Sequence, residues 1–299
     1  MKKAIVLFAI TAIILAFALP GCQSEKPATD GALKFNLQKG KTYDYEIGWA
    51  TELRSQGKTT TTTIGALFSM TVEDAQNGVE TMSVQCRRLK MNVNQDGTDI
   101  NDFDSDKPGP GGDSEIELET LVRKVFSGII GKPFTLKVDD RGNVMELSGF
   151  EKNIDQEIES MHLDPEMQTY VEISMKGEFS DNSIKDMFSH AFNVFPAKKI
   201  NEGDVWEKSF STSGKMSSKY SAAYTAKTIR DDRSVITVKS QISPDNESLN
   251  ISGSEEGSLT IDNKTGLIID GEFEQNSEIS FGEEKVEITV KSIIRGKAD

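Results

Sequence analysis

Hydrophobic and polar residues alternate along most of the chain after residue 32, with the period expected for β-strands that bury one face. The first such strand places four large residues on one face: Tyr43, Tyr45, Ile47 and Trp49. Turns at residues 55–58 and 74–78 divide residues 33–93 into an antiparallel meander. In the third strand the apolar residues stand at even positions from Met82 to Cys86 and at odd positions from Leu89 onward. This change predicts a bulge at Arg87 and Arg88.

Three stretches have the helical period. Ser114 and Glu117 have the spacing of a capping box before a helix over residues 118–129, which ends at Gly131 and Pro133. The apolar spacing also predicts helices over 150–163 and 180–192, and Pro196 stops the second of these. Residues 134–147, between the helices at 118–129 and 150–163, are predicted to form a hairpin.

After Gly203 the chain returns to strands, and six are predicted: residues 205–210, 220–229, 234–242, 248–261, 266–275 and 285–294. The sequence from Phe134 to Gly142 parallels that from Gly257 to Gly266, with an acidic turn and a glycine in each. This echo indicates two related halves, although glycine-strand-turn patterns also recur by chance in β proteins. The predicted fold class is a β-dominated α+β fold, with antiparallel meanders in two related halves joined by a short helical segment.

The predicted boundaries follow from these patterns. They are a signal peptide at 1–21, a lipidated cysteine and tether at 22–31, a first β-rich half at 32–150 with an acidic loop at 96–113 and one helix, a helical connector at 151–196, and a second β-rich half at 197–299.

The amino terminus has the pattern of an export signal that ends in a lipid-attachment site. Lys2 and Lys3 precede an apolar stretch at residues 4–18 that is short for a membrane span. Residues 19–22, Leu-Pro-Gly-Cys, resemble the lipobox of bacterial lipoproteins, although Pro20 departs from its usual residue. The resemblance implies that Cys22 carries acyl chains such as palmitate. The alternative is an ordinary cleaved signal peptide that leaves Cys22 as a free thiol.

Acyl chains on Cys22 satisfy the two-signal requirement for stable membrane attachment. The expected partner is therefore a membrane, contacted through the N-terminal acyl chains, and the polar residues 23–31 form a tether. Because Gln23 and Ser24 follow the cysteine instead of Asp, lipoprotein sorting favours the periplasm-facing side of the outer membrane in a host with two membranes.

Composition excludes several classes of function. The formal net charge is −14, so the chain repels nucleic acids at long range. Two histidines and two cysteines are too few for a histidine- or thiolate-rich metal cluster. If Cys22 is acylated, Cys86 has no partner within the chain and is predicted to be a buried structural residue on a strand.

Four short motifs resemble the DUF6263-type bacterial lipoproteins, a family of unknown function. They are residues 37–43, 130–134, 139–144, and Phe195-Pro196 followed by 202–206. The likeness spans most of the chain after the signal peptide, but its glycines and aromatics shape turns and strands. The resemblance therefore implies no catalytic residues.

The acidic segment around residues 96–113 contains the weak candidates for a metal site. Asp102, Asp104 and Asp106 are closely spaced, with Asp99 and Asp113 nearby, as a calcium loop requires. However, Lys107 stands where an EF-hand needs glycine, and Asp113 occupies the position of the bidentate glutamate. A solvated acidic loop is the favoured interpretation, so no metal or other cofactor is predicted.

No catalytic residues are predicted either. His162 and His190 are conceivable general bases, but no partner is recognisable, and neither a nucleophile elbow nor a complete phosphate loop occurs. Helix-packing or surface histidines are favoured. Tyr43, Tyr45, Trp49 and Trp206 could line a groove for a lipid or a sugar, although such residues more often anchor strands to a core.

The sequence thus predicts a bacterial cell-envelope lipoprotein with a non-enzymatic role, which binds an apolar or envelope ligand or a protein partner at the membrane surface. The alternative is an envelope-located hydrolase that uses carboxylates. A cleft with two converging carboxylates would favour the hydrolase.

Overall fold

The computed structural model describes residues 33–107, 118–176, 179–211, 218–244, 250–281 and 284–298. The predicted signal peptide, Cys22 and the tether lie outside the described residues, as does Asp113. None of the described helices is both long enough and apolar enough to cross a membrane.

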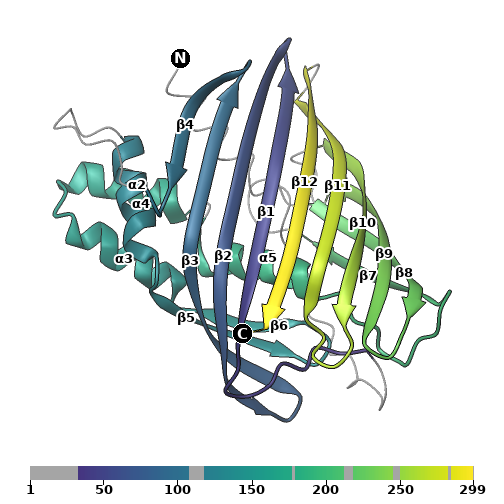
Figure 1. Ribbon diagram of the computed structural model, residues 1–299. Coiled ribbons are helices and arrows are strands. Elements are labelled where there is room, and N and C mark those ends of the chain that lie inside the picture. Colours follow the sequence, from purple (N-terminus) through teal and green to yellow (C-terminus); the bar gives the residue numbers. More distant parts are fainter. Residues whose placement is uncertain are drawn as a thin grey trace.

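Within these ranges, twelve strands form one antiparallel sheet accompanied by four helices (Figure 1). The strands are β1 Thr42–Ser55, β2 Lys58–Gln76, β3 Val79–Gln95, β4 Thr98–Asp104, β5 Pro133–Asp139, β6 Val144–Ser148, β7 Val205–Ser211, β8 Ser218–Ile229, β9 Arg233–Pro244, β10 Asn250–Asp262, β11 Ile268–Phe281 and β12 Glu284–Ala298. The helices are α2 Leu118–Ile129, α3 Phe150–Ser160, α4 Pro165–Lys176 and α5 Asp181–Phe192. The predicted β-dominated α+β class is confirmed.

The strand order places the first and last described strands, β1 and β12, in the middle of the sheet. The order is β6-β5-β3-β2-β1-β12-β11-β10-β9-β8-β7, and β4 pairs with β3 outside this path. β1 and β12 pair along almost their whole length, from Tyr43 opposite Ala298 to Arg54 opposite Glu287. The two meanders are therefore continuous with each other through main-chain hydrogen bonds.

The predicted bulge in the third strand is confirmed. Cys86 faces Phe68 and Arg88 faces Leu67, so Arg87 is the extra residue on β3. This extra residue restores Met91 and Val93 to the buried face after the parity change.

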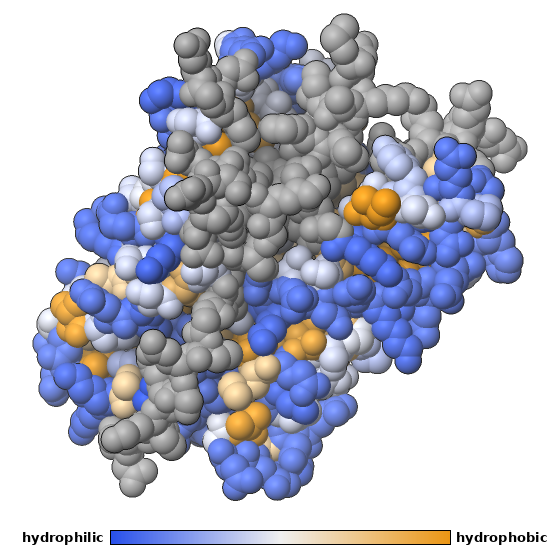
Figure 2. Space-filling model, turned by 180° about the vertical axis from the view of Figure 1, so that it is seen from behind, coloured by the Kyte–Doolittle hydropathy of each residue, from blue (hydrophilic) through white to orange (hydrophobic). Residues whose placement is uncertain are grey.

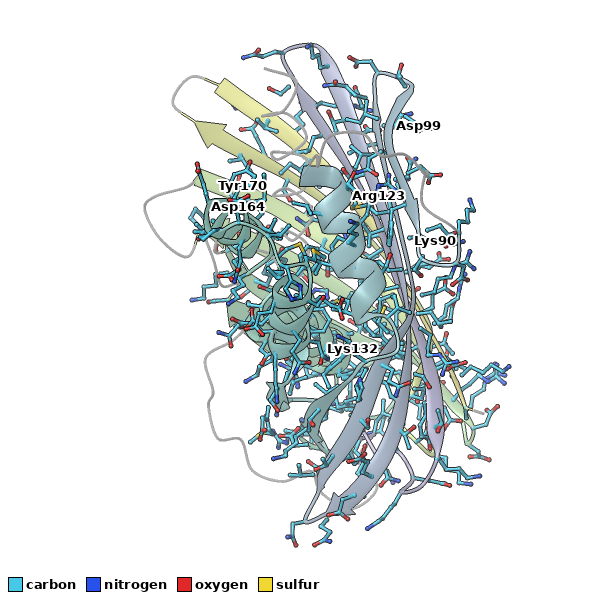
Figure 3. The ribbon with its side chains drawn as sticks, turned by 90° about the vertical axis from the view of Figure 1, so that its left-hand side faces the viewer. Lys90, Asp99, Arg123, Lys132, Asp164 and Tyr170 are labelled. Carbon is cyan, nitrogen blue, oxygen red and sulfur yellow. The ribbon has the colours of Figure 1, made fainter. Side chains whose placement is uncertain are left out.

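The sheet coils around α5, which lies against its inner face (Figure 1). The rings of Phe188 and Phe192 lie 5.1 Å, centroid to centroid, from those of Phe68 and Tyr45, respectively. Figure 3 shows the helices on one side of the sheet and Lys90 on the other side. The alternation of each strand thus divides it into an inner, buried face and an outer, polar face.

Local signals in the sequence fix the start of α5. The Ser180 hydroxyl accepts a hydrogen bond from the Ser183 N–H, which caps the first turn. The Asp181 carboxylate accepts from the N–H groups of Gly149 and Glu151, which ties this end of α5 to the start of α3. The position of α5 against the sheet is therefore fixed at its first residue.

The interpretation of residues 96–113 as an acidic loop is wrong for residues 98–104, which form β4. Asn101 and Phe103 are buried on the inner face, where Phe103 packs against Phe126 of α2 and Asn101 accepts a hydrogen bond from Arg123. Asp102, the acidic residue between them, faces outward. Inner-face packing therefore overrides the low strand propensity of a segment rich in aspartate.

α4 was not predicted. Its sequence has a weak helical pattern because Tyr170 and Ile173 are exposed while Val171 and Met175 are buried. The Asp164 carboxylate accepts hydrogen bonds from the N–H groups of Glu166 and Met167, which caps the helix. Figure 3 shows Asp164 and Tyr170 in the helical layer, away from the sheet.

Residues 33–38, which we call the strap, cross one end of the coiled sheet. The strap lies at the lower edge of Figure 1, just before β1. Phe35 donates its N–H to the carbonyl of Asp140 in the β5–β6 turn, and Asn36 donates to that of Thr265 in the β10–β11 turn. The Leu37 N–H donates to the Glu80 carboxylate of β3. The strap thus connects the two turns that echo each other in the sequence.

Glycines permit the close approaches at these two turns. Gly142 and Gly266 both have positive φ, 78° and 72°. A Cβ on Gly142 would lie 1.8 Å from the carbonyl oxygen of Phe192, and one on Gly266 would lie 2.1 Å from that of Lys34. Only glycine fits at either turn.

The described surface on the helical side is mostly hydrophilic, with small, separate apolar patches (Figure 2). Tyr170, Ile173, Met145 and Val205 are the large hydrophobic residues that remain exposed.

Candidate functional site

Both faces of α5 are buried, although only one is apolar. Phe188 and Phe192 contact the aromatic core under the first meander. On the opposite side Asp186, Ser189 and His190 are also withdrawn from solvent. A polar helix face inside a protein needs polar partners, and the partner of His190 lies on the second meander.

A row of polar side chains crosses the inner face of the second meander at the level of His190. Ser240 pairs with Glu255, and Glu255 pairs with Gln275, so the three residues lie side by side on β9, β10 and β11. Glu255 and Gln275 are 4% and 3% exposed. The Ser240 hydroxyl lies 3.4 Å from Oε1 of Glu255.

His190 contacts this row. Its Nε2 lies 3.6 Å from Oε2 of Glu255. Three aromatic rings surround the imidazole at centroid distances of 5.4 to 6.2 Å: Phe210, Tyr220 and Phe273. No partner for His190 is recognisable in the sequence because Glu255 is far away along the chain.

The hydrogen-bonded row continues beyond Glu255. The Tyr220 hydroxyl donates to Oε1 of Gln275 at 3.4 Å, and Nε2 of Gln275 donates to the Ser277 hydroxyl at 2.7 Å. Burial raises the pKa values of Tyr220 and Tyr224 above the ordinary tyrosine range, and the charge of Glu255 adds to both rises. Both phenols therefore remain neutral hydrogen-bonding groups at physiological pH.

The row extends into the first meander through the central strand pair. Gln275 faces Val290, which faces Thr51, which in turn faces Thr62. Thr51 and Thr62 are each 1% exposed, and their hydroxyls have no hydrogen-bond partner among the described residues. Leaving such groups unbonded is costly, so the two hydroxyls are an unsatisfied polar feature of the inner face.

Apolar residues flank this polar row on the side away from the strap. They are Ile242, Ile251, Ile279, Val286 and Ile288, all buried. On the other side lie the aromatic core and α5. The inner face therefore offers a polar stripe next to a branched aliphatic surface, an arrangement that matches an amphiphilic molecule.

The three aspartates proposed as weak metal ligands are not brought together as a cation site. Asp104 and Asp106 both form ion pairs with Arg88, at 2.8 and 3.0 Å. The hydrogen bond from Arg88 lowers the pKa of Asp104 to about 2. Asp102 lies on the outer face opposite Asn92. Within the described ranges, no three His, Cys, Asp or Glu side chains are close enough to hold a metal ion.

Most of the candidate aromatic residues belong to the core. Tyr43 and Tyr45 are buried in it. Trp206 stacks on Tyr224 at 5.6 Å and donates from its indole N–H to the carbonyl of Val194. Trp49 is partly exposed and lines a hollow of about 500 Å³ beside β4.

This hollow has a floor of small residues on the outer face, including Gly48, Ala50 and Gly65. Its rim carries three lysines and three acids: Lys90, Lys107, Lys291, Glu46, Asp102 and Asp104. The balanced charges indicate no single class of ligand, which makes it a weaker candidate than the inner row.

His162 and Cys86 have structural surroundings. His162 is exposed, and its Nδ1 lies 2.7 Å from the carbonyl oxygen of Ser160. Cys86 is buried, as predicted, and its thiol donates to the carbonyl of Arg88 at 3.5 Å. Burial raises the pKa of this thiol to about 12, so it remains protonated and unreactive.

Comparison with known families identifies the chain. A family described as "Family of unknown function (DUF6263)" matches residues 77–268, which is more than half of the sequence. The protein belongs to the DUF6263 family. The resemblance noted in the sequence is thereby confirmed, whereas the match does not include the predicted lipobox.

Among solved structures, this DUF6263 protein is similar in fold to lipovitellin, in a structure entitled "Lipid-protein interactions in lipovitellin". The TM-score is 0.51 at 10% identity, over 88% of this chain and 25% of lipovitellin. The DUF6263 chain thus spans about a quarter of the length of that protein. No curated protein sequence matches the chain.

Two further likenesses are too distant to support an argument. A DUF1329 family protein from Desulfovibrio piger has a TM-score of 0.18 at 9% identity, over 86% of each chain. The COG4313 outer membrane channel from Pseudomonas putida has a TM-score of 0.25 at 8% identity, over 91% of this chain and all of the channel.

Sequence reasoning missed the polar row of this DUF6263 protein. Glu255 and Glu256 are adjacent acids that resemble a solvated run, but strand alternation places Glu255 inside and leaves Glu256 outside, where it pairs with Lys239. The signal in the sequence was an acid, Glu255, at a position that strand alternation places on the buried face. The approach of His190 depends on tertiary packing, and no local pattern indicates it.

Proposed function

We propose that this DUF6263 protein is an envelope lipoprotein that binds an amphiphilic ligand against the inner face of its coiled sheet. The role is non-enzymatic. The ligand's polar group contacts the row of Thr51, Thr62, Gln275, Glu255 and His190, and its hydrocarbon part lies against the neighbouring aliphatic residues.

The observation that carries this proposal is the polar row itself. Folding tolerates buried polar groups when they are hydrogen-bonded, and among the described residues the hydroxyls of Thr51 and Thr62 are not. A ligand with a polar group supplies the missing partners, while the hydrophobic effect favours contact between its chain and the aliphatic surface. The likeness in fold to lipovitellin, whose structure concerns lipid-protein interactions, supports the same class of ligand.

The anchoring half of the proposal is supported by the lipobox. Acylation of Cys22 would hold the protein at the membrane, and the residues after it favour the outer membrane in a host with two membranes. The test is Cys22→Ser in the native host, followed by [3H]palmitate labelling and membrane fractionation. We expect the variant to lose both label and membrane association, and unchanged association would contradict the anchor.

Ligand binding is tested with a fluorescent fatty acid, 11-(dansylamino)undecanoic acid, titrated into the purified protein. Two pairs of variants separate the inner face from the outer face. Glu255→Gln and Thr62→Val change the inner row, whereas Glu256→Gln and Thr63→Val make the same changes at exposed neighbours.

We expect the wild type and both outer variants to bind the probe with similar affinity. Each inner variant should change Kd by roughly 5- to 30-fold, the effect of one altered hydrogen-bonding group at about 1 to 2 kcal/mol. Absence of saturable binding to the wild type, or equal effects of the inner and outer variants, would contradict the proposal.

The hydrolase alternative has one supporting observation, the contact of His190 with Glu255. A histidine oriented by a carboxylate can act as a general base. However, the neighbouring hydroxyl of Ser240 bonds to Glu255, so the arrangement lacks the order of a nucleophile-base-acid triad. Binding is therefore the function that the geometry supports better.

A further inference from the structure

The strap fixes the point at which the chain enters the folded body. Phe35 and Leu37 are both 2% exposed and pack inward, while Lys34, Asn36 and Gln38 are exposed. The N–H groups of residues 35–38 donate, in turn, to Asp140, Thr265, Glu80 and the Tyr43 hydroxyl. Because four separate elements receive these bonds, this entry point cannot move without disrupting that end of the sheet.

The length of the chain before the strap limits how far this end can lie from an anchor at Cys22. Ten residues separate Cys22 from Leu33, which span at most roughly 36 Å when fully extended. The sheet is much longer, because the 19 residues of β2 extend for about 60 Å. An anchored protein therefore has its strap end near the bilayer, whereas the opposite end is free to lie far from it.

The strap and the residues just after it carry positive charge on a strongly acidic protein, although Asp74, Asp140 and Asp262 lie in or next to the neighbouring turns. Residues 33–41 contain Lys34, Lys39 and Lys41 and no acid, in a chain of net charge −14. All three are exposed, and Lys39 pairs with Asp74. Lys264 is also exposed, and its carbonyl accepts a hydrogen bond from the Asn36 side chain, which places it beside the strap.

We propose that Lys34 of the strap, Lys39 and Lys41 just after it, and Lys264 dock on an anionic phospholipid surface, so that the coiled sheet stands with its strap end toward the membrane. This inference rests on the proposed lipid anchor at Cys22. Lysines near an anionic bilayer are attracted to it, whereas the acidic remainder is repelled. The short tether increases the effective concentration of the lysines at the surface. The β1–β2 and β3–β4 turns then face away from the membrane.

The experiment uses the full-length, acylated protein in vesicles containing 30% phosphatidylglycerol and phosphatidylcholine with brominated acyl chains. A thiol-reactive fluorophore is placed at Gln38→Cys on the strap or at Thr98→Cys at the start of β4. Both positions are exposed and uncharged, and they lie at opposite ends of the sheet. Native Cys86 is buried and unreactive.

We expect brominated lipid to quench the label at position 38 at least threefold more than the label at position 98. Equal quenching would show that the body lies flat, and stronger quenching at position 98 would show the reverse orientation. Either result overturns the proposal.

The contribution of charge is tested by combining Lys34→Gln, Lys39→Gln, Lys41→Gln and Lys264→Gln in the labelled Gln38→Cys protein. Quenching should fall to the level seen with pure phosphatidylcholine vesicles. The control, Lys239→Gln with Lys285→Gln, removes exposed lysines elsewhere on the sheet and should leave quenching unchanged. Equal loss in both variants would contradict docking through the strap.

Flotation of the same vesicles separates this proposal from the anchor on which it rests. Failure of the wild type to float contradicts the anchor at Cys22. Flotation without preferential quenching at position 38 leaves the anchor standing and contradicts only the docked orientation.

Discussion

Glu80 is a buried carboxylate that links the strap to pH. Burial raises the pKa of Glu80 to about 8, and the charge of Asp140 adds to the rise, whereas the hydrogen bond from Leu37 opposes it. An unfolded glutamate ionises near about 4.3. Between these two values the folded protein binds more protons than the unfolded chain, so the free energy of unfolding falls as the pH rises.

We therefore predict that Glu80→Gln removes much of the pH dependence of stability. The wild type should lose on the order of 4 kcal/mol from about pH 5 to about pH 9, while the variant keeps an oxygen acceptor for Leu37 and shows a flatter profile. Urea denaturation at a series of pH values measures both. Glu73→Gln, at an exposed position of β2, is the control, and equal slopes for wild type and Glu80→Gln would refute the prediction.

Gly142 at the β5–β6 turn is required because a side chain there would collide with neighbouring backbone. Gly142 and Gly40 have the same φ of 78°, but only Gly142 faces a backbone oxygen, that of Phe192. Gly40→Ala should cost about 1 kcal/mol, the price of a left-handed conformation. Gly142→Ala should cost at least about 3 kcal/mol more, because rigid backbone must move. Chemical denaturation compares the two variants, and similar costs would show that the turn relaxes freely.

At the scale of elements, the strap is stabilised by one aromatic contact in particular. The ring of Phe35 lies 5.0 Å from that of Phe192 and 6.2 Å from that of Phe195. Phe35→Ala should lower the free energy of unfolding by about 3 to 5 kcal/mol and expose the Asn36 and Leu37 amides to hydrogen exchange. Asn36→Ala, which removes an exposed side chain and its hydrogen bond to the Lys264 carbonyl, should change stability by less than about 1 kcal/mol. Equal effects would mean that the strap is held by its backbone alone.

The sequence predicted the elements that depend on residues close together in the chain, and it missed those that depend on contacts with distant segments. Strand alternation sufficed for β1 to β3, and the parity change at Arg87 was enough to locate the bulge. β4 was missed because its inner residues, Asn101 and Phe103, lie among acids at positions 99, 102 and 104, and their burial depends on α2. The pairing of β1 with β12 joins segments more than 200 residues apart, so no local pattern could indicate it.

The candidate site was less predictable than the elements that carry it. The inward position of Glu255 follows from alternation once the strand is known, but its contact with His190 joins a helix to a strand 65 residues away. The row formed with Thr51 and Thr62 requires the central pairing. The site therefore depends on the least local contact in the fold.

At the scale of the whole molecule, the pairing of β1 with β12 predicts that the two meanders unfold together. Each meander holds one of the two tryptophans, Trp49 and Trp206. Single-tryptophan variants, Trp49→Phe and Trp206→Phe, therefore report on one meander each. Their fluorescence midpoints in urea should each coincide with that of circular dichroism for the same variant. Separate transitions would show that the meanders fold independently.

The central position of β12 also bears on the order in which the chain can fold. β12 follows the other described strands in the chain, yet β1 and β11 both need it as a neighbour. Until it is made, each presents an open edge, and the sheet that surrounds α5 cannot be completed. A nascent chain of this protein thus cannot complete the sheet around α5 until residues 284–298 have been synthesised.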